Sequence, residues 1–197
     1  MQRNEQDRAA WMDPTEAPRE LEQLHSASFG WAMACCQRER EWAEDVLQTA
    51  YLKVLDGRAR FEGRTSFKTW FFAVIRRTAA DERRRSVLRR LKLMAYGEFV
   101  RPDSPSSLAS DALERADQAG MFQKALAALP QRQREVLELV FYHDLTIEQS
   151  AEVMDVSLGS ARTHYERGKK RLREWIERSE ARDEHGLTRR ENPSPVS

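Results

Sequence analysis

The chain has 197 residues, of which 40% are hydrophobic and 33% are charged, and its formal net charge is only +1. This length allows one domain or two small ones, and the longest apolar runs, Trp31 to Cys36 and Trp70 to Ile75, are too short to span a bilayer. The two cysteines, Cys35 and Cys36, are neighbours without His or Cys partners at zinc spacing. We therefore expect a cytoplasmic protein, and not a membrane protein, a disulfide scaffold or a zinc domain.

Apolar residues recur at helical spacing along most of the chain, and no segment alternates as a strand does. After a polar N-terminal extension of residues 1–18, the first half predicts helices over 21–37, 43–57 and 67–90. The third has Ser66 as a candidate N-cap. The segment from Arg76 to Lys92 contains eight basic residues and only two acidic ones. A basic run is by default a solvated surface, but this density favours contact with a nucleic-acid backbone.

Residues 96–112 contain Pro102, Pro105 and several serines, with little apolar content, which is typical of a flexible linker. Two more helices are predicted after it, over 113–129 and 132–142. The domains would be 19–95 and 113–178, and the tail from 179 to 197 is expected to be disordered because it holds prolines and mixed charges. The predicted fold class is all-α, with two small helical domains joined by a flexible linker.

Residues 146–175 read TIEQSAEVMDVSLGSARTHYERGKKRLREW, two helical patterns around a tight turn. Thr146 and Gln149 form a potential capping box, and Ser157 is a candidate N-cap for the second helix. This layout predicts a helix-turn-helix whose second helix enters the DNA major groove. The alternative is an amphipathic helical hairpin with a solvated basic face.

No catalytic set is evident in the sequence. The four histidines are scattered, the carboxylates lie on helix faces, and there is neither a glycine-rich phosphate loop nor metal-ligand spacing. We therefore expect neither an enzyme nor a bound metal or cofactor.

Three segments together carry a family resemblance. They are AEDVLQTAYLKVL from residue 43, RFEGRTSFKTWFFAVIRRTAADERRR from residue 60, and ALPQRQREVLELVFYHDLTIEQSAEVMDVSLGSARTHYERGKKRLR from residue 128. In this order they resemble bacterial sigma factors of the extracytoplasmic-function type, in the sigma-70 family. The resemblance covers about residues 21–95 and 113–177. It implies a factor that binds core RNA polymerase, recognises the −35 and −10 promoter elements and assists −10 melting.

The same resemblance implies protein partners. The first segment is similar to the helix that grips the beta-prime clamp helices of the polymerase, and Asp45, Gln48 and Lys53 match its polar positions. Each of the three could also be ordinary solvated surface. A contact with the beta flap and an anti-sigma factor are implied as well, although no residue identifies the anti-sigma factor.

The second segment is implied to melt and read the −10 element. Phe61 matches the aromatic of the family's F-x-G-x-[ST] loop, where a pocket for a flipped-out base is implied and an aromatic ring offers a stacking platform. Alternatively, Phe61 plugs the domain core. Trp70 is expected to support the core. The implied DNA-binding cations are Arg76, Arg77, Arg84 and Arg85, with Arg77 standing where relatives usually carry asparagine.

The third segment is implied to read the −35 element. Its matching positions are Arg162, Thr163, His164, Arg167 and Lys170, and His164 stands where many relatives have arginine. Arginines can read guanine edges or hold phosphates. Gly168 replaces a usual alanine in mid-helix, at a cost of about 1 kcal/mol in helix propensity.

The alternative function is a stand-alone helix-turn-helix regulator that binds operator DNA as a dimer. Such a regulator has no need of the polymerase-binding helix or the basic long helix, and an obvious dimerisation stripe is not visible. The first domain therefore favours the sigma factor.

Overall fold

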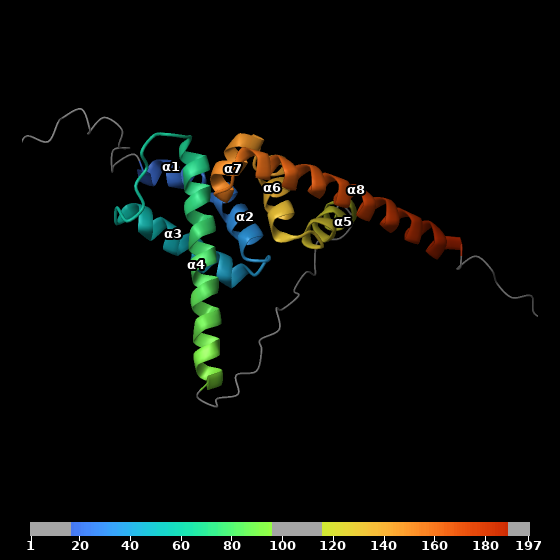
Figure 1. Ribbon diagram of the computed structural model, residues 1–197, viewed down its shortest axis with the longest axis horizontal. Helices are drawn as coiled ribbons and strands as arrows, with labels where there is room; N and C mark the ends of the chain where they lie inside the picture. Colours follow the sequence, from blue (N-terminus) through green and yellow to red (C-terminus); the bar gives the residue numbers. More distant parts are fainter. Residues whose placement is uncertain (1–16, 96–115, 189–197) are drawn as a thin grey trace, which may run out of the picture.

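The computed structural model describes residues 17–95 and 116–188, and this part forms eight α-helices without a strand (Figure 1). The first half contains α1 (Ala17–Gln23), α2 (His25–Cys35), α3 (Arg40–Leu55) and α4 (Phe67–Ala95). The second half contains α5 (Ala116–Ala127), α6 (Gln131–Phe141), α7 (Ile147–Met154) and α8 (Leu158–Thr188). The all-α fold class is confirmed. None of these described helices is long and apolar enough to cross a membrane.

The largest differences from the expected helix limits are in three places. The helix predicted over 21–37 is divided at Leu24 into α1 and α2, and α2 ends early because Gln37 and Arg38 have φ of 56° and 68°. The basic helix α4 continues past residue 90 to Ala95. The disorder expected from 179 is wrong as far as Thr188, because this stretch is rich in helix formers and contains no proline.

Some predictions lie outside the described residues. These are the polar extension as far as residue 16, the flexible linker over 96–112, the first residues of the helix predicted over 113–129, and the tail from 189.

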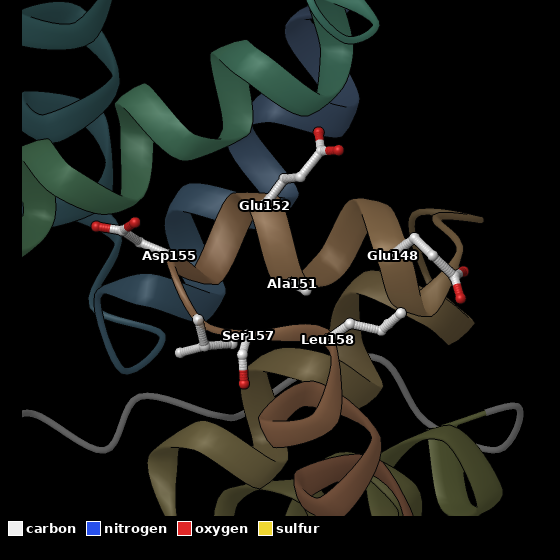
Figure 2. A pocket seen from close by; sticks show the side chains of 7 residues that line it. Glu148, Ala151, Glu152, Asp155, Ser157 and Leu158 are labelled. Atoms are coloured by element: carbon white, nitrogen blue, oxygen red, sulfur yellow. The ribbon is translucent and has the colours of Figure 1, made fainter.

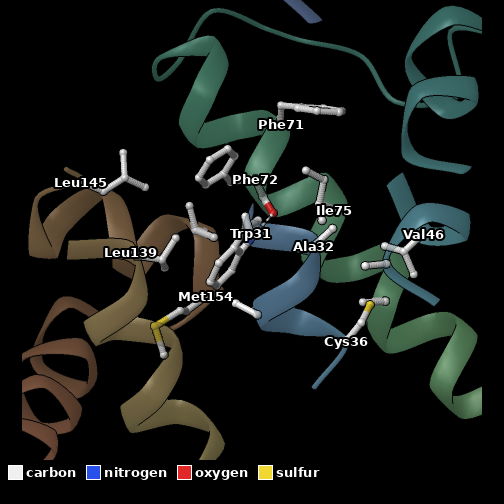
Figure 3. Packing of buried hydrophobic residues seen from close by; sticks show 14 of the residues in the cluster. Trp31, Ala32, Cys36, Val46, Phe71, Phe72, Ile75, Leu139, Leu145 and Met154 are labelled. Atoms are coloured by element: carbon white, nitrogen blue, oxygen red, sulfur yellow. Dashed lines mark hydrogen bonds between the residues drawn. The ribbon is translucent and has the colours of Figure 1, made fainter. Parts of the chain in front are cut away.

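Aromatic side chains fill the space between α2 and α4 in the first half. Trp31 and Phe72 are fully buried, and Figure 3 shows them at the centre of the packed cluster. The indole N–H of Trp31 donates to the backbone carbonyl of Phe72 at 3.0 Å, so the polar atom is satisfied inside the core. The start of α4 is fixed by Ser66, whose hydroxyl accepts from the amide of Thr69 at 3.1 Å. This confirms the predicted N-cap.

Both cysteines lie at the end of α2. Cys36 is buried and Cys35 is half-buried. Burial raises the pKa of the Cys36 thiol to about 12, with Glu82 and Glu39 adding to the effect. Burial likewise raises the pKa of Cys35 well above its ordinary value. Both groups are therefore protonated thiols at neutral pH.

The helix-turn-helix consists of α7, a short turn and the start of α8. The hydroxyl of Thr146 accepts from the amide of Gln149 at 3.2 Å, and the Gln149 side chain accepts from the amide of Thr146 at 2.9 Å. Asp155, with φ of 54°, ends α7 in the left-handed region. Ser157 then accepts from the amide of Ser160 at 3.2 Å and caps α8. The predicted capping box and N-cap are both confirmed.

Gly168 has a packing role in addition to its cost in helix propensity. A Cβ placed on it would lie 3.0 Å from Cδ1 of Leu137 and 3.3 Å from the backbone oxygen of Gln133, whereas one placed on Gly159 would meet nothing within 4 Å. The glycine therefore lets α8 approach α6 closely.

We expect Gly159→Ala to stabilise the chain by up to about 1 kcal/mol through helix propensity. In Gly168→Ala that gain is offset by a steric cost of about 1–3 kcal/mol, because α6 backbone has to move. Urea unfolding of the two variants measures the difference. If Gly168→Ala were as stable as Gly159→Ala, the close approach of α8 to α6 would carry no energetic constraint.

The two halves of the chain pack against each other. In Figure 1, α7 lies beside α4 and α6 lies beside α2, and both pairs are in contact. Leu139, Leu145 and Met154 of the second half are buried in the same cluster as Trp31 and Phe72 of the first (Figure 3). One continuous apolar core therefore crosses the boundary between the halves.

His143 is wedged into that boundary. Its ring is edge-on to Trp31, with centroids 5.9 Å apart, and edge-on to Phe72, with centroids 4.9 Å apart. Only 6% of the residue is exposed. Burial, together with the charges of Lys68 and Arg38, lowers the pKa of His143 to about 4, although Asp144 opposes the shift. The imidazole is therefore neutral at pH 7.

This depressed pKa makes stability depend on pH. Between pH 6.5 and 4 the unfolded chain binds a proton that folded His143 rejects, so the free energy of unfolding falls as the pH falls. At up to about 1.4 kcal/mol per pH unit, the loss from pH 6.5 to 5 reaches about 2 kcal/mol.

Urea unfolding of the wild type and of His143→Gln at pH 7, 6 and 5 tests this expectation. The gap in stability between the two proteins should shrink as the pH falls. Burial raises the pKa of Glu138, which acts in the opposite sense, but it does so in both proteins. A gap that stays constant across the series would remove His143 as the cause.

Candidate nucleic-acid interface

The first turns of α8 present a basic face to solvent. Arg162, Thr163, Arg167 and Lys170 are exposed, and His164 is half-buried. The Thr163 hydroxyl donates to the backbone oxygen of Gly159 at 2.9 Å, which fixes its rotamer. Because residues three and four apart share a helix face, Arg167 and Lys170 lie one and two turns beyond Thr163 on the same side of α8.

Arg162 is held by the first helix of the motif. Its guanidinium lies 3.2 Å from Oε1 of Glu148, and both side chains are exposed. The pKa of Glu148 is lowered by its own backbone amide at the start of α7, and then by the hydrogen bond from Arg162. Glu148 was not predicted as a site residue. Its carboxylate contacts an arginine side chain that stays exposed to solvent.

A cleft of about 550 Å³ lies beside the turn that joins α7 to α8. Figure 2 shows Glu148, Glu152 and Asp155 along α7, with their carboxylates pointing outward in different directions, and Ser157 and Leu158 in the turn and at the start of α8. Phosphates are repelled by this acidic side of the motif. The positive potential of the motif is therefore concentrated on α8.

A second basic surface follows α4. Arg77, Arg84 and Arg85 are exposed, whereas the side chain of Arg76 is only 15% exposed. The Nε of Arg76 lies 3.2 Å from Oε2 of Glu135 on α6. Of the predicted DNA-binding cations on α4, Arg76 is thus engaged by the second half of the chain.

Phe61 lies in the loop between α3 and α4 and is half-buried. Its ring is perpendicular to that of Phe67, with centroids 5.4 Å apart, and tilted against Trp70 at 5.3 Å. One part of the ring therefore packs on α4 while another part remains accessible. Trp70, predicted as a core residue, is half-buried and supports this cluster.

The predicted polymerase-binding residues lie on α3. Asp45 and Gln48 are exposed, while the Nζ of Lys53 donates to the hydroxyl of Thr78 on α4 at 2.9 Å. A groove of about 700 Å³ between α3 and α4 is lined by Asp45 and Gln48 on one side and Arg85 on the other. The structure thus brings Asp45, Gln48 and Arg85 together and places Lys53 in a contact between helices.

The charged residues between the halves were not predicted from the sequence. Arg38 pairs with Glu138, and the Nζ of Lys68 donates to the backbone oxygen of His143 at 2.6 Å. One signal was available, because Glu135 and Glu138 lie three residues apart among the inward-facing apolar residues of α6. Acids at such positions indicate a basic partner.

Comparison with known proteins assigns two regions of the chain to described families. Residues 21–89 match the family described as Sigma-70 region 2, and residues 119–172 match Sigma-70, region 4. The chain is 31% identical over 144 residues to the ECF RNA polymerase sigma factor SigX of Bacillus subtilis, covering 71% of this chain and 73% of SigX. It is 30% identical over 138 residues to the ECF RNA polymerase sigma factor SigF of Caulobacter vibrioides, covering 70% and 72%.

Two solved structures share the fold. The sigma factor RpoE of Bartonella quintana, in complex with the anti-sigma factor NepR, aligns with a TM-score of 0.62 at 23% identity, covering 83% of this chain and 98% of RpoE. CnrH, in complex with the cytosolic domain of CnrY, aligns with a TM-score of 0.55 at 16% identity, covering 84% and 90%.

Proposed function

The chain belongs to the sigma-70 family, as a sigma factor of the extracytoplasmic-function type. From this premise we propose which of its residues contact the polymerase and which contact each promoter element. A factor of this kind binds core RNA polymerase and directs transcription from specific promoters through their −35 and −10 elements. The family consists of initiation factors and not of enzymes, so that RNA synthesis is carried out by the polymerase. The observation that carries the proposal is the exposed basic face of α8 behind a capped turn.

For the −35 element, α8 is the recognition helix and enters the major groove. Arg162, Thr163, His164, Arg167 and Lys170 are the contacting residues. Glu148 orients the side chain of Arg162, which reaches into the groove. The planar guanidinium of Arg162 is suited to a bidentate contact with guanine. Lys170, farther along the helix, is suited to a phosphate.

For the −10 element, the Phe61 loop and α4 hold the opened strand. Thermally opened bases are captured when an unstacked base packs on the accessible part of Phe61, which shifts the equilibrium toward the open state. Arg76, Arg77, Arg84 and Arg85 hold the backbone nearby. The arginine at position 77, where relatives usually have asparagine, favours phosphate binding over base recognition there.

For the polymerase, α3 provides the contact with the beta-prime clamp helices. Asp45 and Gln48 are exposed and available for it. Lys53 supports that surface through its bond to Thr78 of α4. We place the first domain at residues 19–95 and the second at 113–178. The second domain contacts the beta flap of the polymerase.

An anti-sigma factor is a further proposed partner. The solved structures of RpoE and CnrH were both obtained in complex with a second protein, in the first case an anti-sigma factor. We also propose that the protein is cytoplasmic, because its proposed partners, core RNA polymerase and promoter DNA, are located there.

A reconstitution tests the function. The purified chain is added to bacterial core polymerase that lacks any other sigma factor, on a genomic promoter library, and the transcript starts are sequenced. Discrete starts that share spaced −35 and −10 motifs are expected. Tight DNA binding by the chain alone, with the polymerase left inactive, would instead favour the stand-alone regulator.

A further inference from the structure

One acidic side chain lies within the basic face of α8. Glu166 follows Arg162 by four residues and precedes Lys170 by four, so the three side chains share one side of the helix. The side chain of Glu166 is 69% exposed. Because a carboxylate repels DNA phosphates, an acid on this face weakens DNA binding unless a hydrogen-bond donor of the DNA meets it.

The neighbouring cations leave this carboxylate without a hydrogen bond in the described part of the chain. The Nζ of Lys169 is 3.9 Å from Oε1 of Glu166, which is beyond hydrogen-bond distance, and it lies over the ring of Tyr165, 5.1 Å from the centroid. Arg162 has the i,i+4 spacing for a pair with Glu166, but its guanidinium is 3.2 Å from Glu148 of α7. Glu148 thus keeps Arg162 from neutralising Glu166.

The chemistry of a carboxylate limits what it can recognise in the major groove. An ionised carboxylate accepts hydrogen bonds and donates none. The base edges in this groove offer two donors, the N4 amino group of cytosine and the N6 amino group of adenine, whereas guanine and thymine present acceptors. The amino group of adenine lies beside the N7 acceptor, which repels the second carboxylate oxygen, and cytosine has no acceptor there. Cytosine is therefore the base that fits.

We propose that Glu166 is a specificity-determining residue that reads a cytosine in the −35 element, an inference that rests on the proposed function of α8. Arg162 lies one helical turn away, about 6 Å along the axis, and base pairs are about 3.4 Å apart. The cytosine is therefore within about two base pairs of the guanine that Arg162 contacts. Any other base turns an acceptor toward the carboxylate, so Glu166 selects by repulsion as well as by attraction.

The test compares three full-length proteins, each combined with core polymerase: the wild type, Glu166→Ala and Glu166→Gln. The templates carry a randomised −35 region, a constant −10 element and a transcribed barcode, so that sequencing of the transcripts gives the base preference at each position. Glu177→Gln, which neutralises an exposed acid about three turns farther along α8, is the control. Alanine and glutamine are good helix formers, so α8 keeps its structure in every variant.

The wild type is expected to prefer cytosine at one −35 position by about fivefold or more over the other bases. Glu166→Ala should lose this preference and keep the preference for guanine that Arg162 supplies. Glu166→Gln should prefer adenine at the same position, because a glutamine amide can bond both N6 and N7 of adenine. The control should show the wild-type pattern.

Three results would overturn the role of Glu166. They are a wild type without a preferred cytosine in the −35 region, a Glu166→Ala protein with the wild-type base pattern, and a Glu166→Ala protein that transcribes all templates more strongly with that pattern unchanged. The last would show that Glu166 is only a repulsive charge. Absence of transcripts from every protein, the wild type included, would refute the proposed function and with it the reading of cytosine.

Discussion

Phe61→Ala is expected to reduce promoter opening about 5- to 100-fold while leaving closed-complex binding largely intact, since stacking on an aromatic side chain contributes about 1–3 kcal/mol per base. The ring is half-buried against Phe67 and Trp70, so part of it is available to an unstacked base. Permanganate reactivity of unpaired thymines in the −10 element measures opening, and gel mobility at low temperature measures closed-complex formation.

Phe61→Leu separates stacking from packing. Leucine keeps an apolar contact with Phe67 and Trp70 but offers no aromatic face. If leucine impairs opening as much as alanine does, stacking on the ring is responsible. Wild-type opening by Phe61→Leu, with a defect in Phe61→Ala, would show that Phe61 acts by filling the domain core, which is the alternative considered for it. If both variants open the −10 element as well as the wild type does, the proposed capture of an unstacked base by Phe61 is wrong.

Arg162→Ala is expected to weaken initiation about 5- to 100-fold on promoters with a good −35 element, because a bidentate contact to a base discriminates by about 1–3 kcal/mol. On promoters without a recognisable −35 element the effect should be small. Run-off transcription from matched promoters, which differ only in that element, measures the ratio.

Glu148→Gln is the companion variant to Arg162→Ala. It removes the carboxylate that orients Arg162 but leaves the guanidinium in place, and we expect a smaller loss with the same dependence on the −35 element. A uniform loss on both promoter types by Arg162→Ala would identify this arginine as a phosphate contact and not as a reader of sequence.

Local patterns were sufficient to predict the helix-turn-helix. Thr146, Gln149 and Ser157 are polar groups whose partners lie three residues away, so the sequence contains both members of each hydrogen bond. The same holds for Ser66 at the start of α4. The residues proposed to bind DNA and polymerase came from the family resemblance, and they stay predictions.

Contacts between distant segments could not be predicted in this way. Glu135 and Glu138 stand at inward-facing positions of α6, which indicates that each has a basic partner, but no local pattern shows that the partners are Arg76 and Arg38, which lie 59 and 100 residues away. The division at Leu24 was missed because α1 and α2 share a continuous apolar pattern. The extent of α8 was missed because mixed charges are compatible with a helix as well as with disorder.

The two thiols at the end of α2 bear on how this factor is connected to oxidative signals. Peroxides react with thiolates and hardly with thiols. Since the raised pKa values of Cys35 and Cys36 leave both thiols protonated at neutral pH, neither cysteine is poised to react with a peroxide.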